Sequence, residues 1–494
     1  MSTMAYRFYR AALVAEMGNA TAEDIGDPIV VTSPTGSVSG VDGTDWTKMG
    51  TTIYKFKGIP YAEPPVGELR LRDPVPVQPW AGVREGADDP EACAQLDESG
   101  SVLGSEDCLY LNVYTPDIKP KILKPVMIWI HGSSSYHPTP SFNTGEASEA
   151  SYNPELLLDE DIVFVSVQYR LGLLGFLSLP GNSHISGNYG LMDQREAMRW
   201  VKANIAYYGG DPARVTIFGQ STGAVSVHTH LLAEDHEDLF QAAIAQSGTV
   251  LTNFGHDVLA NSMKAVQDVG CHSEEYSHDD VHRCLQSVSL ESLIEQPFHF
   301  WPVYDRPSSI PSIPFKPSSL IEGAGKKIPF LIGTNTEEAA NLANKNVYQA
   351  VPALMRFVYK DRSVQLTTDA WFGMPAYQAY FQHGQHAPVY GYILAELCAA
   401  SEPSSGTGVT HGEDLNCLFY RENRTGGEAM VKSWTNFAKY HDPSPSWDPV
   451  SGWRFAKGGR IGIFGDLEKE GKRLENIVQR IELWNKLGNE VMKP

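Results

Sequence analysis

The amino-acid sequence predicts an α/β fold with a large, mostly parallel central sheet flanked by helices. Four apolar, strand-like runs are separated by long segments, several of which have helical periodicity; the runs are Val126–Ile130, Ile162–Gln168, Val215–Phe218 and Pro329–Ile332. The third run leads into a predicted helix through a tight turn at Gly219–Gly223. Because parallel strands leave their carboxyl ends open to one crevice, we expect the functional side chains to gather there.

The segment Leu191–Val201 is predicted to be a crossover helix between the second and third strands. At helical spacing, its apolar residues Met192, Ala197, Met198 and Val201 lie on one face. A helix of this kind is what joins two parallel strands of one sheet.

The chain is predicted to form one domain over residues 32–494, preceded by a flexible N-terminal segment at residues 1–31. Large α/β enzymes with insertions often fold around one sheet, and neither an internal repeat nor a convincing interdomain linker interrupts the 494 residues. Hydrophobic residues make up 42% and charged residues 20%, which suits a globular protein with a sizeable core.

The charge balance excludes some classes of partner. With 39 basic and 59 acidic residues, the net charge of -20 opposes binding to nucleic acid or to an anionic membrane surface. Apolar runs also stay well below the roughly 20 residues that cross a bilayer. We therefore expect a small-molecule partner, no nucleic acid and no membrane span. The oligomeric state stays open.

The segment Gly219-Gln220-Ser221-Thr222-Gly223 resembles a nucleophile elbow, the turn between a strand and a helix that presents a reactive serine. Small residues flank the serine because this turn is tight. The turn lifts the hydroxyl and leaves the next backbone N–H free to stabilise an oxyanion. Ser221 is the predicted nucleophile.

A serine nucleophile needs a histidine that takes its proton and an acid that orients the histidine. His411 lies in a glycine-flanked loop that follows the strand-like Val389–Leu394, and Glu337 and Glu338 follow the fourth apolar run. Ser, acid, His is the chain order of α/β-hydrolases. The spacing alone does not choose between the two glutamates.

The cysteines favour an oxidising compartment. Cys93 and Cys108, and Cys271 and Cys284, form two closely spaced pairs that would each close a short loop, although four reduced core thiols are the alternative. The pairing of the other two cysteines, Cys398 and Cys417, stays open.

Other signals for the compartment are divided. Sequons at Asn19-Ala20-Thr21 and Asn423-Arg424-Thr425 suit a secreted glycoprotein. The apolar run Ala11–Ala15 is too short for a secretory signal, so a cytoplasmic location stays possible; an incomplete N-terminus would resolve this conflict.

Three further motifs carry a family resemblance over nearly the whole chain. They are Phe56-Lys57-Gly58-Ile59-Pro60-Tyr61-Ala62-Glu63-Pro64-Pro65, Glu106-Asp107-Cys108-Leu109-Tyr110-Leu111-Asn112-Val113 and Tyr208-Gly209-Gly210-Asp211-Pro212. With the elbow, they make the chain similar to type-B carboxylesterases, the family that includes cholinesterases, juvenile hormone esterases and neuroligin-like adhesion proteins. The resemblance implies an α/β-hydrolase fold in which helical insertions form a gorge.

The resemblance also implies roles for single residues. The family's nucleophile falls on Ser221, its acid on Glu338 and its base on His411. Ser247 matches a serine that hydrogen-bonds the acid, although a satisfied core serine is an equal alternative. The family's first two disulfides map onto Cys93–Cys108 and Cys271–Cys284. The resemblance implies neither a metal nor a cofactor.

The sequence departs from the family after Val126–Ile130, where most active relatives carry three glycines that bind the oxyanion. Here the run is His131-Gly132-Ser133-Ser134-Ser135, so the oxyanion donors fall on Ser133, Ser134 and Thr222. Serine in place of glycine restricts the backbone, so a slower or more selective esterase is expected. Gln220 is typical of juvenile hormone esterases. The Cys93–Cys108 loop lacks tryptophan, which disfavours choline esters.

The predicted function is hydrolysis of small, mostly apolar carboxylic esters through an acyl-enzyme intermediate. Two alternatives stay open. One is a family member without turnover that acts as a binding or adhesion protein. The other is a stoichiometric scavenger of esters or organophosphates, which deacylates slowly because its oxyanion loop is imperfect.

Overall fold

The structure is a computed structural model that describes residues 29–43, 52–133, 141–179, 184–233, 237–252, 257–273, 275–304, 325–342, 363–396, 398, 408–420, 424–444, 454–456 and 459–464. The predicted flexible segment, residues 1–31, lies outside these ranges except for residues 29–31. Those residues begin strand β1, so the sheet starts before the predicted domain boundary at residue 32. Both sequons also have their asparagines outside the described residues.

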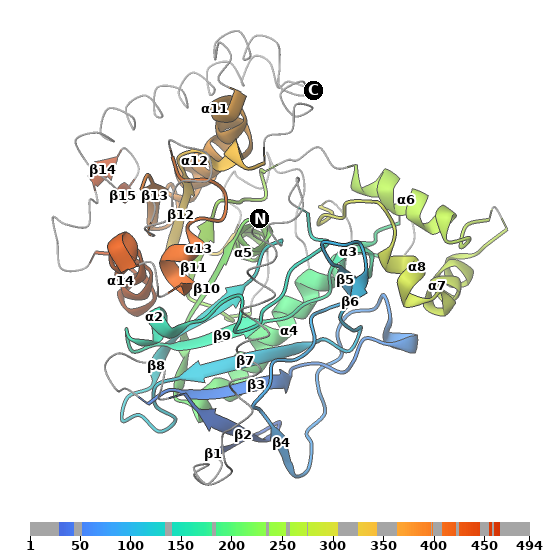
Figure 1. The fold of residues 1–494 in the computed structure, drawn as a ribbon, viewed down its shortest axis with the longest axis horizontal. Coiled ribbons are helices and arrows are strands. Elements are labelled where there is room, and N and C mark those ends of the chain that lie inside the picture. The colour runs from blue at the N-terminus through green and yellow to red at the C-terminus, as the bar shows by residue number, and fades with distance from the viewer. Residues whose placement is uncertain are drawn as a thin grey trace.

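One 13-stranded sheet dominates the described part of the chain (Figure 1). Its strands, in spatial order, are β1 (Ile29–Ser33), β2 (Gly36–Asp42), β3 (Tyr54–Pro60), β7 (Tyr110–Thr115), β9 (Val163–Val167), β8 (Lys124–Ile130), β10 (Gly210–Gln220), β11 (Ala242–Gln246), β12 (Phe330–Asn335), β13 (Val389–Leu394), β15 (Gly459–Phe464) and β14 (Arg454–Ala456), and β4 (Val83–Glu85) pairs with β2. In this order, the pairs from β9 to β15 are parallel, whereas the pairs from β1 to β9 and the pair of β15 with β14 are antiparallel. The additional strand β4 runs parallel to β2. A separate short hairpin pairs β5 (Gln95–Leu96) with β6 (Val102–Leu103).

The predicted large, mostly parallel sheet is confirmed. The four predicted strands correspond to β9 and to parts of β8, β10 and β12, and the crossover helix is α4 (Tyr189–Asn204). The antiparallel edge and the strand β11 were not predicted. Strand β11 has the sequence Ala-Ala-Ile-Ala-Gln, in which Ile244 is the one β-branched residue and no residue is aromatic, so the composition that marks a strand is weak.

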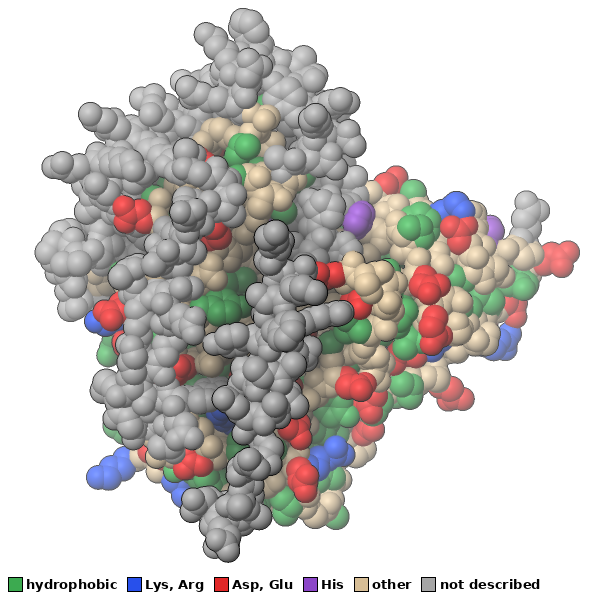
Figure 2. Space-filling view, viewed as in Figure 1, with side chains coloured by type: hydrophobic (Ala, Val, Ile, Leu, Met, Phe, Trp, Pro, Cys, Tyr) green, Lys and Arg blue, Asp and Glu red, His purple; other side chains and the backbone are tan. Residues whose placement is uncertain are grey.

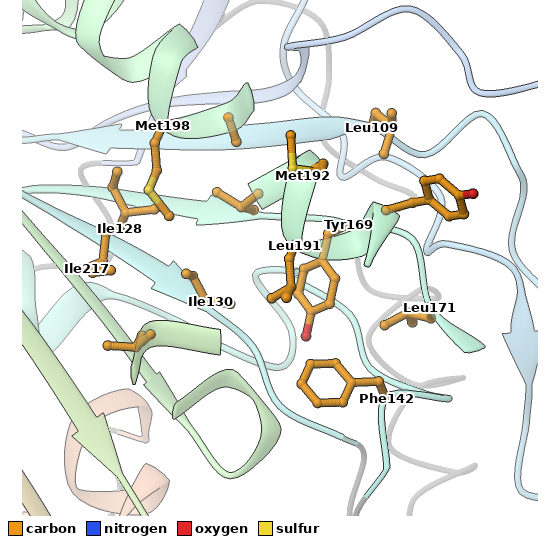
Figure 3. Close-up of a cluster of buried hydrophobic side chains, with 14 of the residues drawn as sticks. Leu109, Ile128, Ile130, Phe142, Tyr169, Leu171, Leu191, Met192, Met198 and Ile217 are labelled. Atoms are coloured by element: carbon orange, nitrogen blue, oxygen red, sulfur yellow. The ribbon is translucent and has the colours of Figure 1, made fainter. Parts of the chain in front are cut away.

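Helices cover both faces of the sheet, and the alternation of side chains along β8 explains how. Ile128 and Ile130 face a core that includes Leu191 and Met198 of α4, and Figure 3 shows these side chains together. The intervening residue Trp129 faces a second core on the other side of the sheet, made with α13 and α14. A strand that is buried on both faces is apolar throughout its buried part, as β8 is from Pro125 to Ile130.

The remaining helices fall into two groups in Figure 1. Helices α6 (Val258–Asp268), α7 (His278–Ser287) and α8 (Leu290–Ile294) lie together at one side, and α11 (Ser363–Thr368), α12 (Met374–His383), α13 (Leu415–Phe419) and α14 (Arg424–Tyr440) lie near β12 to β15. The described part of the chain also contains the shorter α2 (Glu155–Leu158) and α3 (Gly172–Phe176) and the helix after the elbow, α5 (Thr222–Leu232). Among these described helices, none has the length and apolar character needed to cross a membrane.

Disulfides join all six cysteines. The structure contains Cys93–Cys108 and Cys271–Cys284, the two pairs that the sequence favoured. A third bridge, Cys398–Cys417, settles the pairing that the sequence left open. Acidic side chains are scattered over the described part of the face in Figure 2, in keeping with the net charge of -20.

Candidate functional site

Ser221 lies in the sharp turn between β10 and α5. Its backbone has φ 57° and ψ -122°, a conformation that a non-glycine residue adopts only when its surroundings enforce it. The chain is crowded on both sides of the serine. A Cβ atom on Gly219 would lie 2.5 Å from the carbonyl oxygen of Ile130, and one on Gly223 would lie 2.1 Å from the same oxygen. The two glycines are therefore required by close packing.

His411 lies between the serine and an acid. Its Nε2 is 2.8 Å from Oγ of Ser221, and its Nδ1 is 2.7 Å from Oε2 of Glu338. With the proton on Nδ1, the imidazole donates a hydrogen bond to Glu338 and accepts one from the Ser221 hydroxyl. This tautomer places a general base within reach of the proton that it must remove.

The carboxylate of Glu338 is fully buried and is held on its other oxygen. Oε1 accepts hydrogen bonds from the Ser247 hydroxyl, at 2.5 Å, and from the Asn335 backbone N–H, at 2.6 Å. These two donors fix the carboxylate so that Oε2 faces His411. The neighbouring Glu337, which the spacing could not separate from Glu338, is partly exposed and donates its backbone N–H to the Val409 carbonyl.

The loop that carries His411 is joined to the loop that carries Glu338. The His411 N–H donates to the Glu338 carbonyl, the Asn335 side-chain amide donates to the Thr410 carbonyl, and Asn341 donates to the His411 carbonyl. The Phe372 ring packs against the imidazole with 4.8 Å between ring centroids. These contacts limit the positions that the imidazole can take.

A second buried carboxylate, that of Asp414, lies behind the triad and was not predicted from the sequence. Oδ2 accepts from the Gln246 amide at 2.7 Å, and Oδ1 accepts from the Asn335 amide at 3.4 Å. Burial, with the nearby charge of Glu338, raises the pKa of Asp414 to about 6. The available signal was an acid three residues after the candidate histidine, but its burial depends on strand ends that are distant in sequence.

Gln220 is buried beside the base. Its side-chain Nε2 lies 3.5 Å from Nε2 of His411, so a neutral amide faces the imidazole edge that also faces Ser221. The residue precedes the nucleophile and lines the same cavity.

The candidate oxyanion residues lie near the serine as far as the structure describes them. Thr222 is the first residue of α5, and N–H groups in the first turn have no partner within their own helix. Ser133 lines the cavity, and its hydroxyl lies 3.3 Å from that of Thr144. The predicted donor Ser134 lies outside the described residues.

A cavity of about 700 Å³ opens onto Ser221 and His411. Its described lining contains both apolar and acidic side chains, whereas the sequence predicted mostly apolar substrates. Leu96, Leu103, Tyr152, Leu342, Leu415 and Tyr420 contribute apolar surface, and Asp97, Glu98, Glu146 and Glu413 contribute carboxylates. Lysine and arginine are absent from the described lining. The described part of the chain has no cluster of three or more His, Cys, Asp or Glu side chains that could hold a metal ion.

Comparisons with known proteins agree with these features. A model of the carboxylesterase family matches residues 27–356 and 345–456. The juvenile hormone esterase of Tribolium castaneum is 36% identical over 511 aligned positions, which cover 85% of this chain and 84% of that protein. The pyrethroid hydrolase Ces2a of Mus musculus is 32% identical, covering 81% and 82%. The cocaine esterase of Oryctolagus cuniculus is 31% identical, covering 83% and 86%.

Proposed function

Because the chain belongs to the carboxylesterase family, we propose that Ser221, His411 and Glu338 are its catalytic triad and that it hydrolyses small, uncharged esters through an acyl-enzyme. The predicted enzyme class, a carboxylic ester hydrolase, is confirmed by the family and its relatives. The observation that carries the proposed triad is the unbroken hydrogen-bonded series from the serine hydroxyl through the imidazole to a buried carboxylate.

The proposed reaction has two steps that use the same residues. In the first step, His411 takes the proton of Ser221 as the hydroxyl attacks the ester carbonyl, and then gives that proton to the leaving alcohol. In the second step, His411 activates a water molecule that releases the acid from Ser221. Glu338 stays ionised, orients the imidazole and stabilises the imidazolium that forms in each step.

The proposed oxyanion site combines the N–H groups of Thr222 with those of Ser133 and Ser134. Negative charge that develops on the substrate oxygen is stabilised by these donors and by the positive end of the α5 dipole. Serine at positions where most active relatives have glycine supports a slower or more selective reaction, since removing one good donor costs about 10²–10³ in rate.

The proposed substrates are uncharged. Four carboxylates in the described lining would repel a substrate that carries its own carboxylate, and the leucines and tyrosines provide apolar contact for an acyl or alkyl group. One domain would hold all three triad residues, because each follows a strand of the central sheet. The three disulfides favour an oxidising compartment, with secretion as the proposed location.

The stoichiometric scavenger is the second candidate, and the serine-substituted loop is the observation that favours it. An oxyanion site that is adequate for acylation but poor for deacylation would trap the acyl group on Ser221. The loss-of-turnover alternative, a binding or adhesion protein, receives no support from a site in which serine, histidine and glutamate are all connected.

Pre-steady-state kinetics with a short-chain aryl ester test the proposal. We expect a burst of aryl alcohol followed by continued turnover, and a lower rate for a matched ester that bears a carboxylate. A burst equal to one product per enzyme with no later turnover would support the scavenger instead. Mass spectrometry of the quenched reaction should find the acyl group on the peptide that contains Ser221, and finding it on another residue would contradict the assignment.

A further inference from the structure

The Cys398–Cys417 disulfide brackets the loop that carries the proposed base. Cys398 follows β13, Cys417 lies in α13, and His411 lies between them in sequence. The family resemblance implied the other two bridges and left this one open. Its Cα atoms are 5.1 Å apart, so the two ends of the loop are joined covalently at one point of the core.

The two cysteines of this bridge are attached to different parts of the structure. On one side, β13 pairs with β12 in register, Leu394 beside Asn335, and the Leu394 carbonyl accepts the N–H of Thr336. Strand β12 leads directly to Glu338. Cys398 lies four residues after the end of β13, so the bridge is attached next to the framework that positions the proposed acid.

On the other side, α13 has little stability of its own. It is a helix of five residues, and its first residue follows Asp414, which makes no side-chain cap bond. A helix this short has too few internal hydrogen bonds to offset the cost of nucleation, so outside contacts must hold it. Cys417 and Phe419 supply them, because both are buried in the core that contains Trp129.

His411 lies one short turn before α13, and its described backbone hydrogen bonds come from one direction, whereas its side chain contacts Ser221 and Gln220 as well as Glu338. Asn341 and Glu338 hold its backbone, and both belong to the loop after β12. The opposite end of the base loop passes through Asp414, whose carboxylate accepts from Gln246 and Asn335, and continues into α13. A shift of α13 would thus tilt the loop about its attachment to the acid and move the imidazole away from Ser221.

We propose that the Cys398–Cys417 disulfide positions His411 against Ser221 and thereby sets the turnover rate. The inference rests on the proposed triad. The bridge joins α13 to the segment just after β13, the strand that pairs with β12, so the base loop and the acid loop are held to the same part of the sheet. Closing the loop also removes alternative loop conformations from the folded ensemble. Cys398 and Cys417 are positioning residues because neither lines the cavity.

The double variant Cys398→Ala/Cys417→Ala tests the proposal, with Cys271→Ala/Cys284→Ala as the matched control. The control bridge closes a loop of similar length, since its cysteines are 13 residues apart and those of the test bridge are 19 apart. Cys271 lies three residues after α6 and Cys284 lies in α7, away from the site. Both variants are compared with the wild type on a short-chain aryl ester, at a temperature at which circular dichroism finds all three folded.

We expect kcat of the Cys398→Ala/Cys417→Ala variant to fall about 10- to 100-fold, the size of effect that a displacement of about 1 Å produces, with KM within about twofold. The control variant should keep kcat within about twofold. An unchanged kcat in the folded test variant, or an equal loss in both variants, would overturn the proposal, because a general loss of stability affects both alike.

If the test variant does not fold, the wild type decides the question. Graded reduction with a phosphine in mild urea, followed by alkylation and peptide mapping, gives the fraction of each bridge that is open. Activity should fall in proportion to the opening of Cys398–Cys417, and activity that survives its complete opening would overturn the proposal. A wild type without serine-dependent hydrolysis would overturn the proposed triad as well, so the two failures are distinct.

Discussion

The hydroxyl of Ser247 donates a hydrogen bond to Oε1 of Glu338, and the other oxygen of that carboxylate faces His411. Ser247 directly follows β11, which pairs with β10, the strand of the nucleophile. The two buried residues therefore join adjacent strand ends, and the serine determines the direction in which the acid points. This contact favours the interpretation of Ser247 as a partner of the acid over that of an isolated core serine.

Replacing Ser247 with alanine should lower kcat by about tenfold and leave KM nearly unchanged. The carboxylate keeps the Asn335 N–H but loses a hydrogen bond to a charged group, which is worth about 1.5–3 kcal/mol. Steady-state kinetics measure the effect. Ser262→Ala is the control, because Ser262 is equally buried and accepts one backbone hydrogen bond far from the site. Equal losses in the two variants would show that Ser247 acts only through stability.

The two adjacent glutamates should respond differently to the same substitution. Glu338→Gln is expected to reduce kcat by about 10⁴, because an amide disfavours the tautomer of His411 that can accept the serine proton. Glu337→Gln should keep kcat within about twofold, since Glu337 is partly exposed. The comparison uses kcat at neutral pH with the unfolding midpoint of each variant as a check. A larger loss for the Glu337 variant would reverse the assignment of the acid.

Several features were predictable from the sequence because their causes are local. The strand β8 is apolar from Pro125 to Ile130, and the strand, the serine and the helix of the elbow follow one another in the sequence. The carbonyl of Ile130, which crowds the two glycines, comes from a distant strand, but the glycines themselves are visible beside the serine. Glu338 could not be separated from Glu337 by spacing, since the difference is burial and a hydrogen bond to a histidine far along the chain. The pairing of Cys398 with Cys417 could not be predicted for the same reason, because spacing alone did not decide it.

Asp414 was missed because its chemistry is created by distant groups. The aspartate becomes buried only when the ends of β11 and β12 supply Gln246 and Asn335 as partners. The strand β11 itself was overlooked because alanine is a weak marker of strands. The antiparallel strands at the N-terminal edge are half-exposed, so they lack the continuous apolar runs that mark the parallel strands.

Asp414 should make stability depend on pH. Its pKa in the folded protein, about 6, lies above the value of about 3.9 for an unfolded aspartate, so the folded state binds the proton more tightly. The free energy of unfolding must then fall as the pH rises from about 4 to about 6, by about 3 kcal/mol from this group. Below and above that window, the contribution is constant.

Urea denaturation of the wild type and of Asp414→Asn at two pH values isolates this effect. The stability of the wild type relative to the variant should fall by about 2 kcal/mol between pH 4.5 and pH 7. Any pH-independent effect of the asparagine on the free energy of unfolding cancels when the values at the two pH values are subtracted. Glu98→Gln, which alters an exposed carboxylate, serves as the control. A relative stability that does not change with pH would contradict the raised pKa.

Restoring glycine in the oxyanion loop should increase the rate. The double variant Ser133→Gly/Ser134→Gly frees the backbone to present its N–H groups to the oxyanion. We expect kcat to rise at least tenfold and by no more than about 10³-fold, because one good donor contributes about 10²–10³ in rate. Ser99→Gly is a control on the exposed loop near the cavity. Single-turnover acylation and deacylation rates identify which step improves. No gain in either rate would mean that the serines are harmless to catalysis.

The most direct test of the proposed triad is steady-state hydrolysis of a short-chain aryl ester by the wild type and by Ser221→Ala, with folding verified for both. We predict sustained turnover by the wild type and a loss of about 10³-fold or more in kcat for the variant, because the acyl-enzyme cannot form without the hydroxyl. Equal rates for the two folded proteins would contradict the account.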